Sequence, residues 1–252
     1  MKEILIKTEG LSKSFSSGGA MQHVLKNIGL ELYKGDFTVI MGASGAGKST
    51  LMYALSGMDT PTLGTITFSG TVISDLDTDA LARFRKEHCG FVFQQIYLID
   101  TMSVLDNVLT AGLLVSKDKK ALTARARELF EAVEIAPETT RKFPTQISGG
   151  EAQRAGIVRA LINAPSVLFA DEPTGALNSK AGLAVLDTLT ACNERGQSIV
   201  MVTHDMRSAR RGNRILYLKD GAVQGECDLG RYRPDDAARH KQLSDFLAEM
   251  GW

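Results

Sequence analysis

Short apolar runs in the first fifth of the chain predict strands. The run at 4–6 and the alternation of apolar and polar residues over 24–32 both have the period of a strand, and 36–41 is rich in β-favouring residues. A serine–glycine cluster at 16–19 predicts a loop. The composition becomes helical over 49–55, so a helix is expected soon after the third strand.

Residues 100–143 have a different pattern. They contain no β-rich run, and their apolar residues are spaced as on one face of a helix. The two stripes consist of Leu105, Val108 and Leu109, and of Leu129, Val133 and Ile135. We therefore predict a helical insertion over 95–159.

On both sides of this insertion, strand and helix patterns alternate. Strands are predicted at 65–68, 90–93, 167–170 and 198–203, and helices at 79–87, 151–163 and 180–194. The repetition of short apolar strands and helices indicates an α/β fold with a mainly parallel sheet covered on both faces.

The last part of the chain predicts one more helix. Over 236–250, Leu243, Phe246, Leu247 and Met250 lie at i, i+3, i+4 and i+7, which is one amphipathic stripe. The stripe is explained either by packing onto the rest of the chain or by binding a partner.

Composition and charge exclude several classes of protein. The 252 residues carry 29 Lys plus Arg and 29 Asp plus Glu, so nucleic acid is not an expected partner. The three separated cysteines form no CxxC pair, which argues against a disulfide framework or a cysteine zinc site. No apolar run is long enough for a membrane span, and the N-terminus lacks a signal-peptide pattern. Any role at a membrane is then expected to involve a partner.

A glycine-rich motif follows the third predicted strand. Its residues are Gly42, Ala43, Ser44, Gly45, Ala46, Gly47, Lys48, Ser49 and Thr50, which match G-x-x-x-x-G-K-S/T. Such a loop turns its N–H groups toward phosphate oxygens, and the next helix adds the positive end of its dipole. Lys48 is expected to reach the β- and γ-phosphates, Ser49 to ligate Mg²⁺, and Thr50 to add a phosphate contact. The motif predicts binding of a nucleoside triphosphate.

Two carboxylates and a histidine follow later strands. Asp171 and Glu172 come at the carboxyl end of the strand at 167–170, where open α/β sheets bind ligands. Asp171 suits Mg²⁺, and Glu172 suits a general base for the attacking water. Acidic residues also occur in ordinary turns after strands. His204 ends the strand at 198–203; it is expected near the γ-phosphate, although a lone histidine there is more often a surface residue.

The segment 147–154, ISGGEAQR, decides the family. It precedes Asp171 by the length of a helix and a strand. Together with the phosphate loop, the FVFQQ stretch at 91–95 and the histidine, the chain resembles the ATP-binding subunits of ABC transporters over nearly its whole length. The resemblance implies a P-loop NTPase core with a mainly parallel sheet, an antiparallel β subdomain and an inserted α-helical subdomain. It divides the single ABC ATPase domain (1–252) into a core of 1–94 and 160–227, a helical signature subdomain of 95–159 and a tail of 228–252.

The resemblance also implies roles for residues outside the phosphate loop. Phe15 is similar to the aromatic residue that stacks on adenine, and Gln94 to the glutamine that senses Mg²⁺ and the attacking water. The signature residues that cap the ATP of a second subunit are Ser148, Gly149, Gly150 and Glu151. Two copies are therefore expected to pair head to tail around two ATP molecules.

Four positions depart from the family's usual pattern. In the signature, Ile147 stands in place of leucine and Glu151 where glutamine is commonest, and both are tolerated variants. Elsewhere, Asn178 stands where aspartate is usual and Phe15 where tyrosine is usual. Asn178 still hydrogen-bonds but has lost a charge, which bears on the coupling of the two ATP sites. Stacking by Phe15 does not need the hydroxyl.

Within the family, the chain is similar to the macrolide-export and lipoprotein-releasing group. The segment 96–108 and the end of the tail resemble most the bacitracin-resistance branch. This implies a peripheral subunit at the cytoplasmic face of a bacterial membrane that powers a multi-span permease acting on peptides or lipids. Two alternatives are a non-transport ABC ATPase that regulates a cell-wall or assembly complex, and a nucleotide switch without useful hydrolysis.

Overall fold

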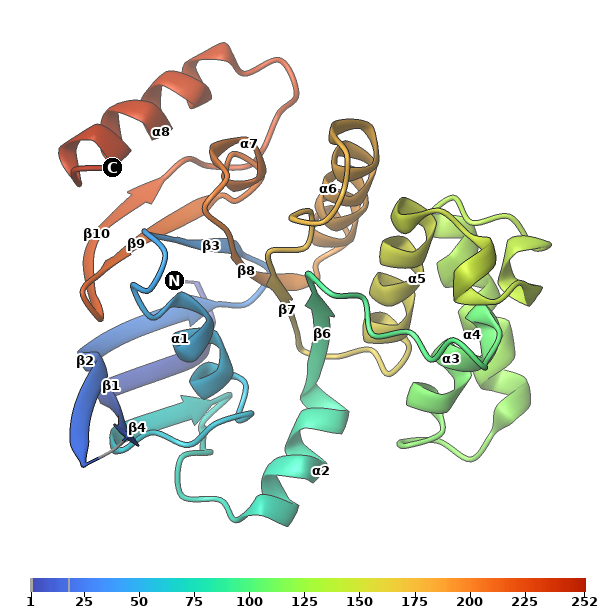
Figure 1. Ribbon diagram of the computed structural model, residues 1–252, viewed down its shortest axis with the longest axis horizontal. Coiled ribbons are helices and arrows are strands. Elements are labelled where there is room, and N and C mark those ends of the chain that lie inside the picture. The colour runs from blue at the N-terminus through green and yellow to red at the C-terminus, as the bar shows by residue number, and fades with distance from the viewer. Residues whose placement is uncertain (1, 18) are drawn as a thin grey trace. The chain divides into compact units, whose positions relative to one another are not determined.

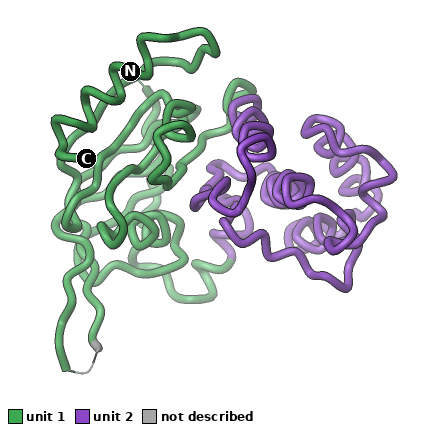
Figure 2. Tube along the Cα trace, turned by 45° about the horizontal axis from the view of Figure 1, so that its top comes forward, with its two compact units in different colours: residues 1–82, 193–252 green, residues 83–192 purple. Residues whose placement is uncertain are grey.

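A computed structural model of the chain describes residues 2–17 and 19–252. These residues form two compact units, one made of 1–82 with 193–252 and the other of 83–192 (Figure 2). The boundaries of the units differ from those of the predicted subdomains, because two strands and a helix of the expected core group with the inserted helices. The predicted subdomain boundaries stay a prediction.

The first unit contains an antiparallel sheet. Its strands, in the order β2-β1-β4-β5, are β1 (Ile4–Ser17), β2 (Ala20–Tyr33), β4 (Leu63–Phe68) and β5 (Thr71–Val72). β1 is much longer than the predicted strand at 4–6. Ser16 and Ser17 pair with Met21 and Ala20, so the predicted loop at 16–19 is wrong for these two residues. Gly18 lies outside the described residues, and Gly19 is in a turn.

A second group of strands in this unit surrounds β3. The strands are β3 (Phe37–Met41), β8 (Ser198–Val202), β9 (Arg214–Lys219) and β10 (Ala222–Asp228). β8 and β9 each pair with β3 in parallel, and β10 pairs with β9 antiparallel. Every residue of β3 and β8 is buried, which explains why nearly all of their residues are apolar and why the alternation of a half-exposed strand is absent.

Four helices complete the description of this part of the chain. They are α1 (Lys48–Leu55), α2 (Thr78–His88), α7 (Met206–Ala209) and α8 (Ala237–Glu249). The sequence of α2 crosses the boundary between the two units, which follows residue 82. α1 begins directly after the phosphate loop, as predicted. No described helix combines the length and apolarity needed to cross a bilayer.

The C-terminal helix α8 packs on the first unit and runs beside β10 (Figure 1). Leu243 and Leu247 are fully buried, and a Cβ on Gly225 of β10 would lie 2.7 Å from the sulfur of Met250. Arg239, on the same face, is 2% exposed. The predicted stripe is therefore used for intramolecular packing.

Arg239 fastens α8 to the loops beneath it. Its guanidinium donates hydrogen bonds to five backbone carbonyls, those of Arg210, Gly212, Leu229, Gly230 and Arg231. The Tyr232 ring lies 5.6 Å from the guanidinium carbon. A buried charge is tolerated here because its donors meet carbonyl oxygens.

The second unit contains one parallel strand pair and the inserted helices. The strands are β6 (Cys89–Phe93) and β7 (Val167–Asp171). The α-helices are α3 (Val104–Gly112), α4 (Lys119–Ala132), α5 (Gly149–Leu161) and α6 (Ser179–Glu194), and two short 3₁₀ helices are η1 (Thr139–Arg141) and η2 (Pro144–Gln146).

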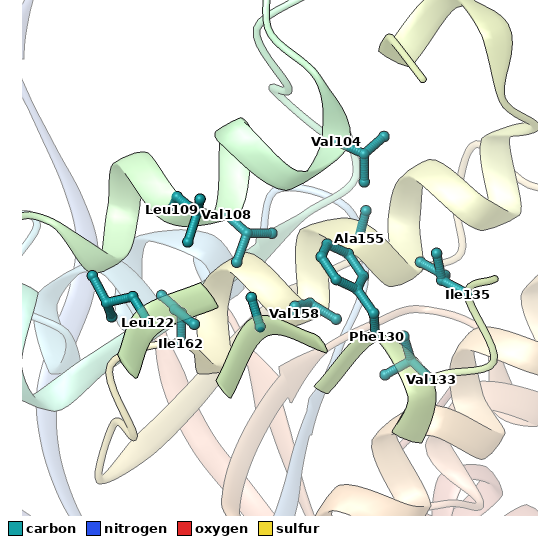
Figure 3. Packing of buried hydrophobic residues seen from close by; sticks show 11 residues of the cluster. Val104, Val108, Leu109, Leu122, Phe130, Val133, Ile135, Ala155, Val158 and Ile162 are labelled. Carbon is teal, nitrogen blue, oxygen red and sulfur yellow. The ribbon is translucent and has the colours of Figure 1, made fainter. Parts of the chain in front are cut away.

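The predicted helical stripes form the core of the insertion (Figure 3). Val108 of α3 and Ala155 of α5 are 0% exposed, and Phe130 of α4 is 2% exposed. The rest of the buried cluster is Val104, Leu109, Leu122, Ala126, Val133, Ile135, Val158 and Ile162, with Leu105 and Leu129 packed against it. Both stripes are confirmed, and the fold class is α/β with mainly parallel pairing around the buried strands, an antiparallel β part and inserted helices.

Candidate functional site

The phosphate loop connects β3 to α1 in the first unit. A Cβ on Gly42 would lie 2.1 Å from the carbonyl oxygen of Leu218, so no side chain fits there. Gly47, the N-cap of α1, has φ 98°, a conformation that other residues adopt only at a cost. The backbone therefore requires glycine at the first and last glycine positions of the motif.

The N-terminus of α1 is prepared for an anion. Its N-cap makes no side-chain hydrogen bond, and its first turn has no acidic residue. The first turn of α1 therefore carries no negative side chain that would repel an anion from the positive end of the helix dipole. Lys48 Nζ donates to the carbonyl oxygens of Gly42 and Ala43, each at 2.9 Å, which holds the ammonium group at the loop. Ser49 and Thr50 lie in the first turn of α1, half-buried.

His204 leaves the strand next to the phosphate loop. Ile40 of β3 pairs with Val202 of β8, and the N–H of Thr203 donates to the carbonyl of Ile40 at 3.2 Å. Gly42, the first residue of the phosphate loop, and His204 each lie two residues after this pair. Both therefore stand at the carboxyl ends of two neighbouring parallel strands. The structure brings them together, with His204 exposed.

Phe15 lies near the end of β1, with 42% of its surface exposed. The ammonium of Lys13 lies 5.0 Å from the centroid of its ring. That ammonium also contacts a carboxylate oxygen of Asp59 at 2.5 Å and the carbonyl of Thr60 at 2.7 Å. A cation on an aromatic face is attractive, so Lys13 helps to hold the ring in place.

In the second unit, Gln94, Asp171 and Glu172 share one strand edge. Phe93 of β6 pairs with Asp171 of β7, so Gln94 and Glu172 are the next residue of each strand. The Gln94 amide lies against the loop after Glu172, since a Cβ on Gly175 would be 2.9 Å from its Nε2. Two carboxylates and an amide thus gather at the carboxyl ends of parallel strands, where α/β sheets bind ligands.

The backbone of Glu172 is strained. Its φ is 46°, in the left-handed region. For a residue with a Cβ this costs roughly 1–2 kcal/mol. Six other described non-glycine residues have a similar φ, so the strain does not by itself mark a site; at Glu172 it fixes the direction in which the side chain leaves the backbone.

Sequence analysis missed Gln153, which supports this edge. It is 1% exposed, and its Nε2 donates to the carbonyl of Phe93 at 2.9 Å and to that of Pro173 at 2.8 Å. It therefore ties the segment after β7 to the end of β6. Its position four residues before the buried Ile157 on α5 is the signal that could have identified it.

The segment predicted as the ABC signature forms the N-terminus of α5. Ser148 is the N-cap, and Glu151 closes a capping box: the N–H and hydroxyl of Ser148 donate to its carboxylate at 2.9 Å and 2.7 Å. These hydrogen bonds, the hydroxyl's first, lower the pKa of Glu151, so the carboxylate is charged at neutral pH. Ser148 and Gly149 are exposed, while Gly150 is buried against Ala181.

Asn178 has a structural role that does not require the charge of an aspartate. Its side-chain oxygen accepts the N–H of Ala181 at 2.9 Å, at the start of α6. Asparagine is as effective as aspartate in this capping position. The departure from the usual aspartate therefore leaves the helix start intact.

The predicted site residues thus fall into two groups. The first unit holds Phe15, the phosphate loop with Lys48, Ser49 and Thr50, and His204; the second holds Gln94, Ser148–Glu151, Asp171 and Glu172. Among the described residues no cluster of three His, Cys, Asp or Glu side chains could hold a metal alone. Mg²⁺ nevertheless fits the residue types present, because it binds a hydroxyl, one carboxylate and phosphate oxygens.

Comparison with known proteins agrees with this chemistry. The family model described as ABC transporter matches residues 25–175. An uncharacterized ABC transporter ATP-binding protein of Methanocaldococcus jannaschii, MJ1508, is 41% identical over 219 residues, covering 87% of this chain and 97% of that protein. The macrolide export ATP-binding/permease protein MacB 1 of Aeromonas hydrophila is 43% identical over 88% of this chain. The chain spans only 34% of that relative.

Solved structures show the same likeness. The ATP-binding cassette MJ0796, in a dimeric post-hydrolysis state bound to ADP and Pi, has a TM-score of 0.83 and 38% identity, covering 90% of this chain and all of that one. A second dimeric structure of MJ0796, with the same coverage and identity, has a TM-score of 0.82. The phosphate loop, the strand-end carboxylates and these matches together show that the chain belongs to the ABC transporter family, as an ATP-binding subunit and ATPase.

Proposed function

We propose that two copies of this chain close head to tail on two ATP molecules and that hydrolysis reopens them. The observation that carries the proposal is the exposed N-terminus of α5. Ser148 and Gly149 present a helix N-terminus to the outside of their own unit, far along the chain from their own phosphate loop. Such a terminus suits the terminal phosphate of a nucleotide held by another copy. The dimeric state of MJ0796 bound to ADP and Pi supports the pairing of two copies.

Each predicted residue has a place in this cycle. Lys48 and the N–H groups of the phosphate loop bind the triphosphate, and Phe15 stacks on the base. Ser49, Asp171 and Gln94 would hold Mg²⁺, which neutralises charge between the β- and γ-phosphates when bound. Electrostatic stabilisation of the leaving phosphate is the largest contribution that such a site offers.

Glu172 and His204 complete the hydrolytic step in our proposal. The Glu172 carboxylate accepts a proton from the attacking water, and its fixed backbone aims it. His204 donates a hydrogen bond to the γ-phosphate. The products are ADP and phosphate, and the loss of the γ-phosphate removes the contact that held the second copy.

We further propose that this cycle drives a multi-span permease from the cytoplasmic face of a bacterial membrane. The MacB relatives are named as ATP-binding and permease proteins in one chain. This chain matches only 34% of their length, as expected if it corresponds to the ATP-binding part alone. The resemblance of segment 96–108 to the bacitracin-resistance branch supports antimicrobial peptides or lipids as the cargo.

Capture of the partner tests the transport role. The full chain with the substitution Glu172→Gln, purified in mild detergent with MgATP from its native host, should retain a multi-span membrane protein. The matched control is Lys48→Ala. This variant should not bind nucleotide and should therefore retain less of the membrane protein. A soluble partner alone would instead favour a regulatory ABC ATPase.

The cargo needs a separate test in the host. Deletion of the gene should increase sensitivity to bacitracin-type peptides, and expression of the unaltered chain should restore resistance. Complementation with Glu172→Gln should fail. Unchanged sensitivity in the deletion strain would refute the proposed cargo and leave the ATPase assignment intact.

A further inference from the structure

An exposed apolar run follows α3 in the second unit. Leu113, Leu114 and Val115, here named the apolar tip, are 45%, 63% and 45% exposed. In no other place within residues 2–17 and 19–252 do three consecutive large hydrophobic residues stand exposed. Runs of this kind are unfavourable in water and usually mark an interaction surface.

The apolar tip is held outward by the packing beneath it. A Cβ on Gly112 would lie 2.8 Å from the side chain of Leu122 and 3.2 Å from that of Ile162, so the interior is already filled where α3 ends. The N–H of Leu113 donates to Leu109 at 2.9 Å, and that of Val115 to Gly112 at 3.1 Å. The filled interior and the hydrogen-bonded turn together leave these three side chains partly exposed at the surface.

A set of lysines follows the tip directly. Lys117, Lys119 and Lys120, here named the basic rim, are all exposed. Two of them lie in the first turn of α4, which contains no acidic residue. Cations are unfavourable there because the helix dipole is positive at its N-terminus. The nearby Asp118 carboxylate accepts the N–H of Ala121 at 2.9 Å as the N-cap.

One partner suits both features. A bilayer with anionic headgroups offers hydrocarbon for the apolar tip and phosphates for the three lysines of the basic rim, which outnumber the single Asp118 carboxylate among them. A protein groove fits less well, because three consecutive residues in a turn make neither a helical stripe nor a strand edge. We propose that the apolar tip and basic rim dock this chain onto an anionic phospholipid surface.

This inference goes beyond the proposed function, since it needs neither ATP nor a permease. It adds a direct lipid contact to a subunit expected to reach the membrane only through a partner. A single short tip gives weak binding, but two copies in a dimer, or one copy bound to a permease, would combine their contacts.

Vesicle flotation of the full chain without nucleotide tests the proposal. The probes are vesicles of phosphatidylcholine alone and of phosphatidylcholine with phosphatidylglycerol. The tip variant carries Leu113→Ser, Leu114→Ser and Val115→Ser, and the rim variant carries Lys117→Gln, Lys119→Gln and Lys120→Gln. The control for the tip variant carries Met21→Ser and Leu63→Ser, because Met21 and Leu63 are 59% and 69% exposed. The control for the rim variant carries Lys26→Gln, Lys219→Gln and Lys241→Gln, at three lysines that are also exposed.

The unaltered chain should bind the phosphatidylglycerol vesicles at least about tenfold better than the neutral ones, and the difference should shrink at high salt. Each rim lysine should account for a factor of about five in affinity. Both variants should lose most of the bound fraction, while both controls and the ATPase activity of all five proteins should stay unchanged. Equal binding to both vesicle types, no binding by the unaltered chain, or full binding by either variant would overturn the proposal.

Discussion

Replacing Glu151 by glutamine should have opposite effects on the folded chain and on the ATP-bound dimer. The carboxylate now accepts two hydrogen bonds from Ser148 at the start of α5. Glutamine keeps an acceptor oxygen there but loses the charge that interacts with the helix dipole. For this partly exposed cap the loss should destabilise the fold by about 0.3–1 kcal/mol.

The dimer should become more stable, because in the proposed head-to-tail arrangement the same charge would face the γ-phosphate bound to the other copy. Two like charges about 4 Å apart repel by about 1 kcal/mol even in water. With two equivalent sites per dimer the total is about 2 kcal/mol, roughly a 30-fold change in the dimer dissociation constant. The family's usual glutamine would avoid this repulsion.

Sedimentation of the dimer with MgATP, in a Glu172→Gln background, measures this effect. The control Asp236→Asn removes a charge from the N-cap of α8, where the carboxylate accepts the N–H of Arg239 at 3.1 Å. It should lower thermal stability by a similar amount and leave dimerisation unchanged. A dimer no tighter for Glu151→Gln than for this control would refute a position of Glu151 beside the nucleotide.

Three further predictions concern the phosphate loop, the C-terminal helix and pH. Lys48→Ala should abolish binding in a fluorescent-nucleotide titration, with thermal stability preserved; unchanged affinity would remove the phosphate-loop assignment. Arg239→Met should lower the free energy of unfolding by at least about 3 kcal/mol in a urea titration, because it leaves several buried carbonyls without donors; a stability close to that of the unaltered chain would contradict this. The folded-state pKa of Glu151 is lowered, chiefly by the Ser148 hydroxyl, so the stability contributed by the carboxylate is complete above the ordinary glutamate pKa and is lost as pH falls through the folded value. Between about pH 6 and 3 the melting temperature of Glu151→Gln should therefore fall less than that of the unaltered chain. Parallel curves for the two proteins would contradict the assignment.

Elements with a clear apolar period could be predicted from the sequence. Val108 on α3 and Leu243 on α8 are buried as their stripes required. The buried strand β8 also matched its continuous apolar run. In each case burial of apolar surface decides the structure, and the sequence pattern records that burial directly.

Buried polar residues could not be predicted by hydropathy. Arg239 lies four residues before Leu243 and Gln153 four before Ile157, so both occupy positions on apolar stripes. Each is buried because loop carbonyls need donors, a demand that depends on tertiary structure. A polar residue on a predicted apolar stripe is the signal that could have been used.

The long antiparallel strands were only partly predictable. β1 and β2 have an exposed face with many polar residues, and the pairing of β1 with β2 shifts register at several places, one of them between Thr8 and Leu11. Such irregularities interrupt the two-residue period on which the prediction depends. The left-handed φ of Glu172 is likewise invisible in the sequence, because only the surrounding structure can impose it.

The roles of the candidate site residues depend on closure of two copies around ATP. Sedimentation of Glu172→Gln, with and without MgATP, tests this closure directly, because the substitution keeps the side-chain shape and removes only the proposed base. We expect a monomer without nucleotide and a stable dimer that retains uncleaved ATP. A chain that stays monomeric with saturating ATP bound, or that releases phosphate at the normal rate, would contradict the account.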